Sequence, residues 1–162
     1  MRVVIQRAKY ATCTVDNQIT GKINKGFMIL VGFKEGDTLE DMDKVLKKVI
    51  GLRIFEDENG KMNKSLHDVN GSILAISQFT LYADCRHGNR PGFTDAMKYD
   101  NASKYYDLFC DKLIEAGIHT EKGIFGADMK IELLNDGPVT ILIDSEDLKW
   151  SHMFLMEKNM II

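Results

Sequence analysis

The chain has 162 residues, of which 44% are hydrophobic and 28% are charged, and its formal net charge is −3. This length fits a single domain with a substantial core, and the composition excludes disordered, collagen-like and coiled-coil chains. The charge balance excludes proteins that grip long stretches of duplex through many phosphates, so we expect any contact with nucleic acid to be local.

The N-terminus lacks a signal-like apolar segment, and no apolar run in the chain approaches the roughly eighteen residues of a membrane span. We therefore expect neither export nor membrane insertion. The three cysteines, Cys13, Cys85 and Cys110, are widely spaced and include no C-x-x-C pair. This usage predicts neither a disulfide framework nor a zinc site, and it favours the reducing cytoplasm.

The first 33 residues alternate between short apolar runs and turn residues. The apolar runs are residues 3–5, 13–15, 19–23 and 27–33, the last reading FMILVGF. The turn residues between them are Asp16-Asn17-Gln18 and Asn24-Lys25-Gly26. This pattern predicts consecutive antiparallel strands.

Two segments have the apolar spacing of amphipathic helices. The first covers residues 39–50, and Thr38 stands three residues before Asp41, as in a capping box. The second begins at residue 101 or 103 and ends at residue 116, ahead of Gly117, a natural C-terminal cap. Both helices need a sheet on which to bury their apolar faces.

Further strands are predicted from short apolar runs at 53–55, 72–79, 129–134 and 139–143. Between the last two, NDGP at 135–138 is typical of a tight hairpin, although a cis bond before Pro138 would instead aim the Gly137 carbonyl outward as a rigid acceptor. Residues 84–98 hold charges of both signs, two glycines and a proline. They predict a long loop, and loops of that length are often functional.

The predicted central strand ends in polar residues, within the segment ISQFTLYAD at 76–84. Strand alternation would place Ser77 and Phe79 on one face, and Gln78 and Thr80 on the other. One interpretation is a site where hydroxyls and backbone N–H groups meet an acyl group. The other is a strand whose polar residues bond to neighbouring loops. The residues alone leave both open.

The long loop offers cations that could contact phosphate, namely Arg86, His87 and Arg90, and Phe125 could stack on a base. Solvated loop charges and a core phenylalanine are the alternative. The four histidines fall at no metal-ligand spacing, and neither GxGxxG nor a P-loop occurs. We therefore expect no metal and no cofactor.

Five segments together resemble the D-aminoacyl-tRNA deacylase family: MRVVIQR at 1–7, LRIFEDENGKMN at 52–63, SQFTLYAD at 77–84, FGADMK at 125–130 and NDGPVT at 135–140. The likeness assigns residues 1–145 to a deacylase domain. Residues 146–162 form a C-terminal tail, which is part of the same domain or a peripheral arm. The resemblance implies an α/β fold, a compact sandwich of two largely antiparallel sheets with a helical layer, in one homodimeric domain.

The activity that this resemblance implies is hydrolysis of the ester between a D-amino acid and the 3′-terminal adenosine of tRNA. The family also removes glycine mischarged on tRNA-Ala, and it rejects L-aminoacyl-tRNA. The implied partners are the tRNA 3′ end and a second copy of the chain, without a membrane and without a cofactor.

The resemblance also implies roles for individual residues, with each site built from two subunits. Phe79 offers its backbone N–H to the scissile carbonyl, while Ser77, Gln78 and Thr80 position and polarise the ester. The Gly137-Pro138 pair of the other subunit is cis and excludes L side chains, and Arg7 holds that pair in orientation. Phe125 and Met129 lie near the terminal adenine.

Several alternatives stay open. The 2′-hydroxyl of the terminal ribose can help to activate water, which we prefer, or Thr80 can act as the nucleophile of a general esterase, although no sequence signature supplies a base for it. A protein that binds the tRNA end without hydrolysis is a further possibility. A deacylase for mischarged L-amino acids would require a trans Gly137-Pro138 bond.

Overall fold

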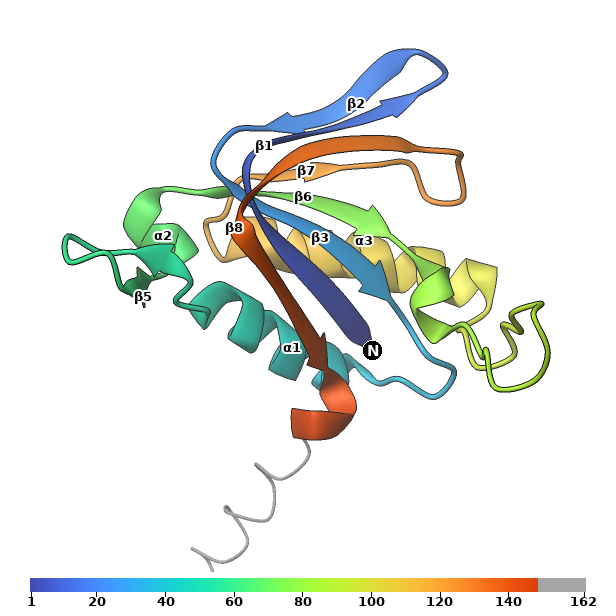
Figure 1. The fold of residues 1–162 in the computed structure, drawn as a ribbon. Coiled ribbons are helices and arrows are strands. Elements are labelled where there is room, and N and C mark those ends of the chain that lie inside the picture. The colour runs from blue at the N-terminus through green and yellow to red at the C-terminus, as the bar shows by residue number, and fades with distance from the viewer. Residues whose placement is uncertain (149–162) are drawn as a thin grey trace, which may run out of the picture.

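The computed structural model describes residues 1–148, which form one α/β domain around a six-stranded mixed sheet (Figure 1). The sheet contains β1 (Arg2–Val15), β2 (Gln18–Ile23), β3 (Gly26–Gly32), β6 (Ser72–Ser77), β7 (Thr120–Lys122) and β8 (Lys130–Asp144). A separate two-stranded sheet consists of β4 (Phe55–Glu56) and β5 (Met62–Lys64). The helices are α1 (Leu39–Gly51), α2 (Leu66–Val69) and α3 (Tyr99–Glu115), with 3₁₀ turns η1 (Phe79–Tyr82) and η2 (Ser145–Leu148).

Strand β1 organises the large sheet. Its first half pairs with β3, its second half pairs with β2, and nearly its whole length pairs with β8, all antiparallel. Strands β3, β6 and β7 are parallel to one another. The sheet curls so that β2 meets β7, where the Thr20 hydroxyl donates to the Lys122 carbonyl (3.3 Å). The result is a nearly closed, barrel-like sheet (Figure 1).

The predicted single α/β domain is confirmed, but its sheets differ from the prediction. One mixed sheet and a small hairpin replace two largely antiparallel sheets. The reason lies in the connections, because α1 and α3 each cross over between neighbouring strands, and a crossover connection makes those strands parallel. The homodimeric state that was part of this prediction stays a prediction.

Both predicted helices are confirmed. Helix α1 begins with a full capping box, in which the Thr38 hydroxyl accepts from the Asp41 N–H (3.2 Å) and the Asp41 carboxylate accepts from the Thr38 N–H (3.0 Å). Helix α3 starts at Tyr99, slightly earlier than predicted, and ends one residue before the predicted end. Gly117 follows at a φ of 85°, a left-handed conformation that favours glycine.

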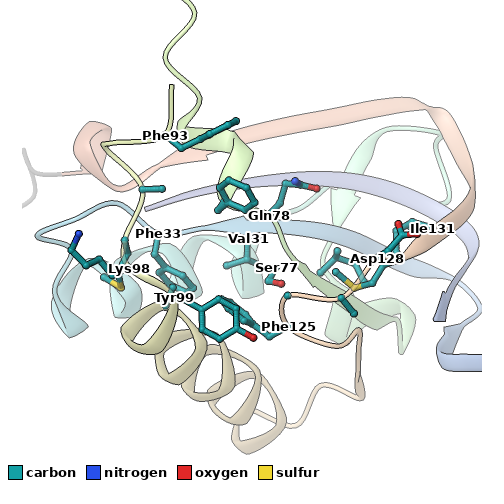
Figure 2. Close-up of a pocket in the computed structure, with 18 of the residues that line it drawn as sticks. Val31, Phe33, Ser77, Gln78, Phe93, Lys98, Tyr99, Phe125, Asp128 and Ile131 are labelled. Carbon is teal, nitrogen blue, oxygen red and sulfur yellow. The ribbon is translucent and has the colours of Figure 1, made fainter. Parts of the chain in front are cut away.

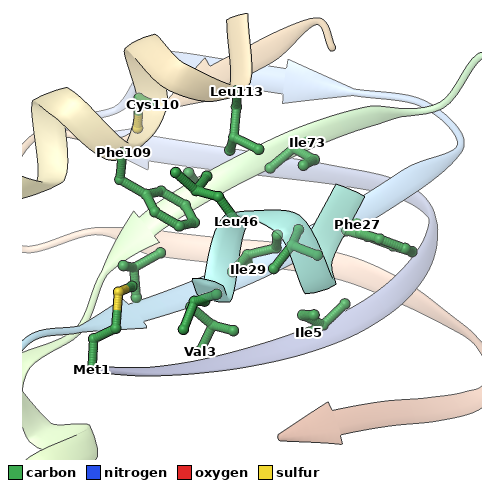
Figure 3. Packing of buried hydrophobic residues seen from close by; sticks show 14 of the residues in the cluster. Met1, Val3, Ile5, Phe27, Ile29, Leu46, Ile73, Phe109, Cys110 and Leu113 are labelled. Atoms are coloured by element: carbon green, nitrogen blue, oxygen red, sulfur yellow. The ribbon is translucent and has the colours of Figure 1, made fainter. Parts of the chain in front are cut away.

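The main core lies between the sheet and these two helices (Figure 3). Alternate residues of β1 and β3 point toward α1 and α3; among them are Val3, Ile5, Phe27 and Ile29. The helices contribute buried residues that include Leu46 of α1 and Phe109 and Leu113 of α3. A smaller cluster, which includes Cys13, Met28 and Ile76, fills the opposite face of the curled sheet. The sheet is therefore buried on both faces where β3 and β6 run side by side, which fixes the position of the end of β6.

Two strand predictions were wrong, and both errors fall on candidate site residues. Strand β6 ends at Ser77 instead of continuing to residue 79, and Phe79 starts a 3₁₀ turn, so strand alternation does not apply to Phe79 and Thr80. The predicted hairpin at 135–138 is instead the middle of the continuous strand β8. Its register against β1 shifts between Gln6 and Ala8, which accommodates the extra residues as a bulge.

The last described turn, η2, is hydrogen-bonded to the N-terminal residue. The Met1 amino group lies 2.7 Å from an Asp37 carboxylate oxygen and 2.6 Å from the Ser145 hydroxyl, and the Ser145 N–H donates to the Met1 carbonyl. The rest of the predicted C-terminal tail, residues 149–162, lies outside the described residues. Among helices within residues 1–148, none is long and apolar enough to cross a bilayer.

Candidate active site

A cavity of about 650 Å³ lies at the end of β6 (Figure 2). Its lining comes mainly from the ends of β3 and β6, the start of η1, the segment 93–99 and the segment 125–129. This volume is in the range of small-ligand sites. Its position follows from the fold, because the two parallel strands end here and the connections that leave them form the walls.

Ser77, Gln78 and Phe79 form one wall of this cavity. The Gln78 N–H donates to the Val31 carbonyl (2.8 Å), which ties the end of β6 to β3. Because η1 starts at Phe79, the first N–H groups of this turn have no acceptor within it. The end of the strand therefore presents side-chain polar groups together with backbone donors.

Thr80 does not line the cavity and is exposed. Its hydroxyl accepts a hydrogen bond from the Gln78 side-chain amide (2.5 Å). An amide N–H group is a donor and cannot take up a proton, so this contact does not activate the Thr80 hydroxyl as a nucleophile. The contact instead fixes Gln78 and Thr80 relative to each other.

Phe125 and Met129, the two residues that the resemblance places near adenine, line the same cavity. Phe125 packs edge-on against Tyr99, with 5.0 Å between ring centroids. Gly126 has a φ of 79°, and a Cβ at this position would lie 2.7 Å from the Tyr99 hydroxyl. Glycine thus lets the segment 125–129 pass close beneath Tyr99.

Gly137, Pro138 and Arg7 lie elsewhere. Arg7 is opposite Phe27 near the start of β3, whereas Ser77 is opposite Val31 near its end. The four residue steps from 27 to 31 correspond to about 13 Å along the strand. None of the three lines the cavity. Within one chain the predicted site residues therefore lie in two separate groups: a first group at the end of β6, and a second group that consists of Arg7, Gly137 and Pro138.

Within the second group, Arg7 holds the backbone that leads into Gly137. Its side chain is only 5% exposed, and its Nε donates to the Asp136 carbonyl (2.8 Å) while Nη1 donates to the Ile54 carbonyl (2.6 Å). Gly137 and Pro138 are exposed, and the peptide bond between them is cis, as the family resemblance implies. The resemblance assigned Arg7 this orienting contact, and the hydrogen bonds are consistent with it.

A smaller recess of about 240 Å³ lies beside η1, and Arg2, Tyr82, Asp84 and Arg86 are among its lining residues. The Arg86 guanidinium, which hydrogen-bonds to Asp84, and the Arg86 backbone N–H together lower the pKa of Asp84 to about 2. Burial raises the pKa of Tyr82 well above its ordinary value. Arg86 is thus already paired within the protein.

Among the cavity residues that sequence reasoning missed are Phe93, Lys98 and Tyr99. Phe93 and Lys98 lie in the predicted functional loop, but nothing in the pattern singled them out. Tyr99 begins α3 and faces the cavity because the capping residue Lys98 turns the chain there. No group of three or more His, Cys, Asp or Glu side chains within residues 1–148 is arranged to hold a metal ion.

Comparisons with known proteins identify the family of the chain. The model of the family described as D-Tyr-tRNA(Tyr) deacylase matches residues 4–144. The D-aminoacyl-tRNA deacylase of Limosilactobacillus reuteri (strain DSM 20016) is 54% identical over 144 residues, which cover 89% of this chain and 99% of that protein. The enzyme of the same name from Bacillus cytotoxicus is 52% identical over 146 residues, which cover 90% and 100% of the two chains.

Two solved structures share the fold of this chain. The c-Myc DNA unwinding element binding protein superposes with a TM-score of 0.84 at 36% identity, over 89% of this chain and 98% of that one. A probable eukaryotic D-amino acid tRNA deacylase has a TM-score of 0.76 at 18% identity, over 88% and 98%, which shows the shared fold. The chain belongs to the D-aminoacyl-tRNA deacylase family.

Proposed function

We propose that this protein hydrolyses the ester between a D-amino acid, or glycine on tRNA-Ala, and the 3′-terminal adenosine of tRNA. It releases free amino acid and tRNA, and it rejects L-aminoacyl-tRNA. The observation that carries the proposal is the meeting of Ser77, Gln78 and Phe79 with Phe125 and Met129 at one cavity, in a chain of this family. We propose the cytoplasm, where aminoacyl-tRNA is used, as its place of action.

In this proposal the terminal adenosine binds beside Phe125 and Met129, and the ester lies at the end of β6. The Phe79 N–H donates to the carbonyl oxygen, where negative charge develops in the tetrahedral transition state. Ser77 and Gln78 hold the ester, and Thr80 holds Gln78 through its hydrogen bond. The 2′-hydroxyl of the terminal ribose helps to activate the attacking water, since the Thr80 hydroxyl accepts from the Gln78 amide, a donor that cannot act as its base.

The second part of the proposal is a homodimer in which Gly137-Pro138 of one subunit faces the cavity of the other. The position of Arg7, about 13 Å along the strand from Ser77, supports it, because the segment that Arg7 holds does not line the cavity of its own chain. Strand β8 also supports it: among residues 1–148 it pairs with β1 alone, and Leu134 and Leu142 on it are 48% and 63% exposed. A long, partly apolar edge strand is a natural surface for a second copy.

The activity is tested by following ester loss from D-tyrosyl-tRNA and L-tyrosyl-tRNA with purified protein, each against a control without protein. We expect rapid loss of the D ester alone. Comparable loss of both esters would refute the chiral filter. Loss of neither, with retained binding, would mean that the protein binds the tRNA end without hydrolysing it.

The composite site is tested by mixing two inactive variants. Gln78→Ala removes an ester contact, and Pro138→Trp places a large ring where the motif would face the partner's cavity. After subunit exchange at equal amounts, half of the dimers are mixed and each has one intact site, so about a quarter of native activity should return. No recovery, or full activity of Pro138→Trp alone, would contradict the shared site.

A further inference from the structure

The loop between η1 and α3 is closed at its base and held against the cavity. Asp84 and Gly92 exchange backbone hydrogen bonds of 2.7 and 2.9 Å. Beyond this base, the Met97 N–H donates to the Phe33 carbonyl (3.0 Å) and the Glu35 N–H donates to the Asp95 carbonyl (2.9 Å). Residues 85–91 are all exposed. The base of the loop is therefore fixed, and Phe93 and Lys98 beyond it line the cavity, while residues 85–91 form the exposed tip of the same loop.

The charge on this surface is positive, although the chain as a whole carries −3. Residues 85–91 contain Arg86 and Arg90 but no acidic residue. Arg86 is neutralised by Asp84. Among the ion pairs found in residues 1–148, none involves Arg90 or Lys98, so these two cations are free to meet an external anion.

Two exposed aromatic rings line the cavity together with Lys98, and one of them, Phe93, follows Arg90 by three residues in the chain. Phe79 and Phe93 are 55% and 37% exposed, and they pack edge-on with 5.0 Å between ring centroids. Both line the cavity. Aromatic rings exposed next to cations are the combination with which proteins bind single-stranded nucleic acid, because any base can stack on the ring.

The cavity walls differ in charge across the opening. Figure 2 shows Phe93 and Lys98 on one side, and Asp128 on the opposite side. Asp128 is paired with Lys130 (3.0 Å), whereas no ion pair found in residues 1–148 involves Lys98, so a phosphate chain that leaves the cavity is attracted to the first side. The terminal adenosine beside Phe125 would therefore be followed by nucleotides that run past Phe93.

We propose that Arg90, Phe93 and Lys98 form a second RNA subsite, which binds the single-stranded nucleotides that precede the terminal adenosine. The neighbouring base stacks on Phe93, and the adjoining phosphates lie beside Arg90 and Lys98. This inference rests on the proposed function and adds to it a reason why a net negative protein binds a tRNA end: its contacts with phosphate are few and local.

The test compares kcat/KM on D-tyrosyl-tRNA with kcat/KM on D-tyrosyl-adenosine, which lacks every nucleotide beyond the last. Arg90→Gln should lower the value for tRNA several-fold at low salt and reduce the salt slope by about 0.7, the amount for one single-strand phosphate contact. It should leave the value for D-tyrosyl-adenosine unchanged. Lys47→Gln, which removes an exposed cation on α1 away from the cavity, is the matched control.

The stacking contact has its own pair of variants. Phe93→Leu keeps an apolar side chain against Phe79 but removes the ring, and it should lower kcat/KM on tRNA by about fivefold or more through KM. Phe93→Trp should retain the native value. If Leu and Trp behaved alike, or if Arg90→Gln affected both substrates equally, the subsite would be refuted. A native protein that cleaves neither substrate would instead refute the proposed function.

Discussion

Replacing Arg7 with methionine tests how the exposed Gly137-Pro138 segment is held in place. The guanidinium is almost fully buried, and its two hydrogen bonds end on the carbonyls of Asp136 and Ile54. Methionine fills much of the same space but leaves both carbonyls without this donor. A buried acceptor that loses its partner costs about 1–3 kcal/mol, so the two together should lower the free energy of unfolding by about 4 kcal/mol.

Urea unfolding followed by far-ultraviolet circular dichroism measures this loss. With a slope of about 2 kcal/mol per molar urea, the midpoint should fall by about 2 M at fixed protein concentration. Arg7→Lys keeps the charge and can keep one hydrogen bond, so it should lose about half as much. Arg53→Met is the matched control, because Arg53 is exposed and its Nε makes a single bond, to the Asn63 carbonyl. We expect a change within about 0.5 kcal/mol for that variant.

A midpoint for Arg7→Met that falls no further than the midpoint for Arg53→Met would refute the reasoning. It would mean that the β4 and β8 backbones keep their positions without the guanidinium. The folded Arg7→Lys protein gives a second readout, the ratio of D-ester to L-ester hydrolysis. This ratio should fall if Arg7 orients the segment that excludes L side chains, and an unchanged ratio would limit Arg7 to a role in stability.

Three further predictions concern other parts of the structure. Arg86→Gln should raise the pKa of Asp84 from about 2 toward its unfolded value of about 3.9, which NMR titration measures. In the native protein the Asp84–Arg86 pair stabilises the fold above about pH 4, and this contribution is lost as the pH falls through 2. The exposed thiol of Cys85 should be the one fast-reacting thiol of the native protein, and Cys85→Ser should abolish the fast phase with a thiol reagent. Gly126→Ala should push Tyr99 aside and raise KM about tenfold or more, and a native KM would show that this wall of the cavity is not used.

The helices of this protein could be predicted from the sequence because their signals are local. The Thr38–Asp41 capping box and the apolar spacing of both helices lie within single stretches of chain. The arrangement of the strands could not. Whether β3 pairs in parallel with β6 depends on a connection of about forty residues, and the pattern of an apolar strand is the same in either direction.

Some residues of the candidate site could be predicted and others could not, because only some of them carry a local signal in the sequence. Ser77 and Gln78 were found because polar residues at the end of an apolar run are a local signal, although the run was expected to continue as a strand through Phe79. The roles given to Gly137 and Pro138 came from the family resemblance, since an NDGP sequence by itself favours a hairpin. Phe93 reaches the cavity only because distant backbone contacts fold its loop back, and no sequence pattern reports such contacts.

In the proposed dimer, the two halves of the site are both built on the large sheet. Ser77 is fixed through the pairing of β6 with β3, and Asp136 is fixed through Arg7 of β1, the strand that pairs with β3 on its other side. A selecting group must be held within a fraction of an ångström to reject one enantiomer, and sheet backbones provide this better than loops do. In this proposed dimer an exposed Gly-Pro segment can therefore reject one enantiomer in the partner's cavity, because the sheet of its own subunit holds the segment in position.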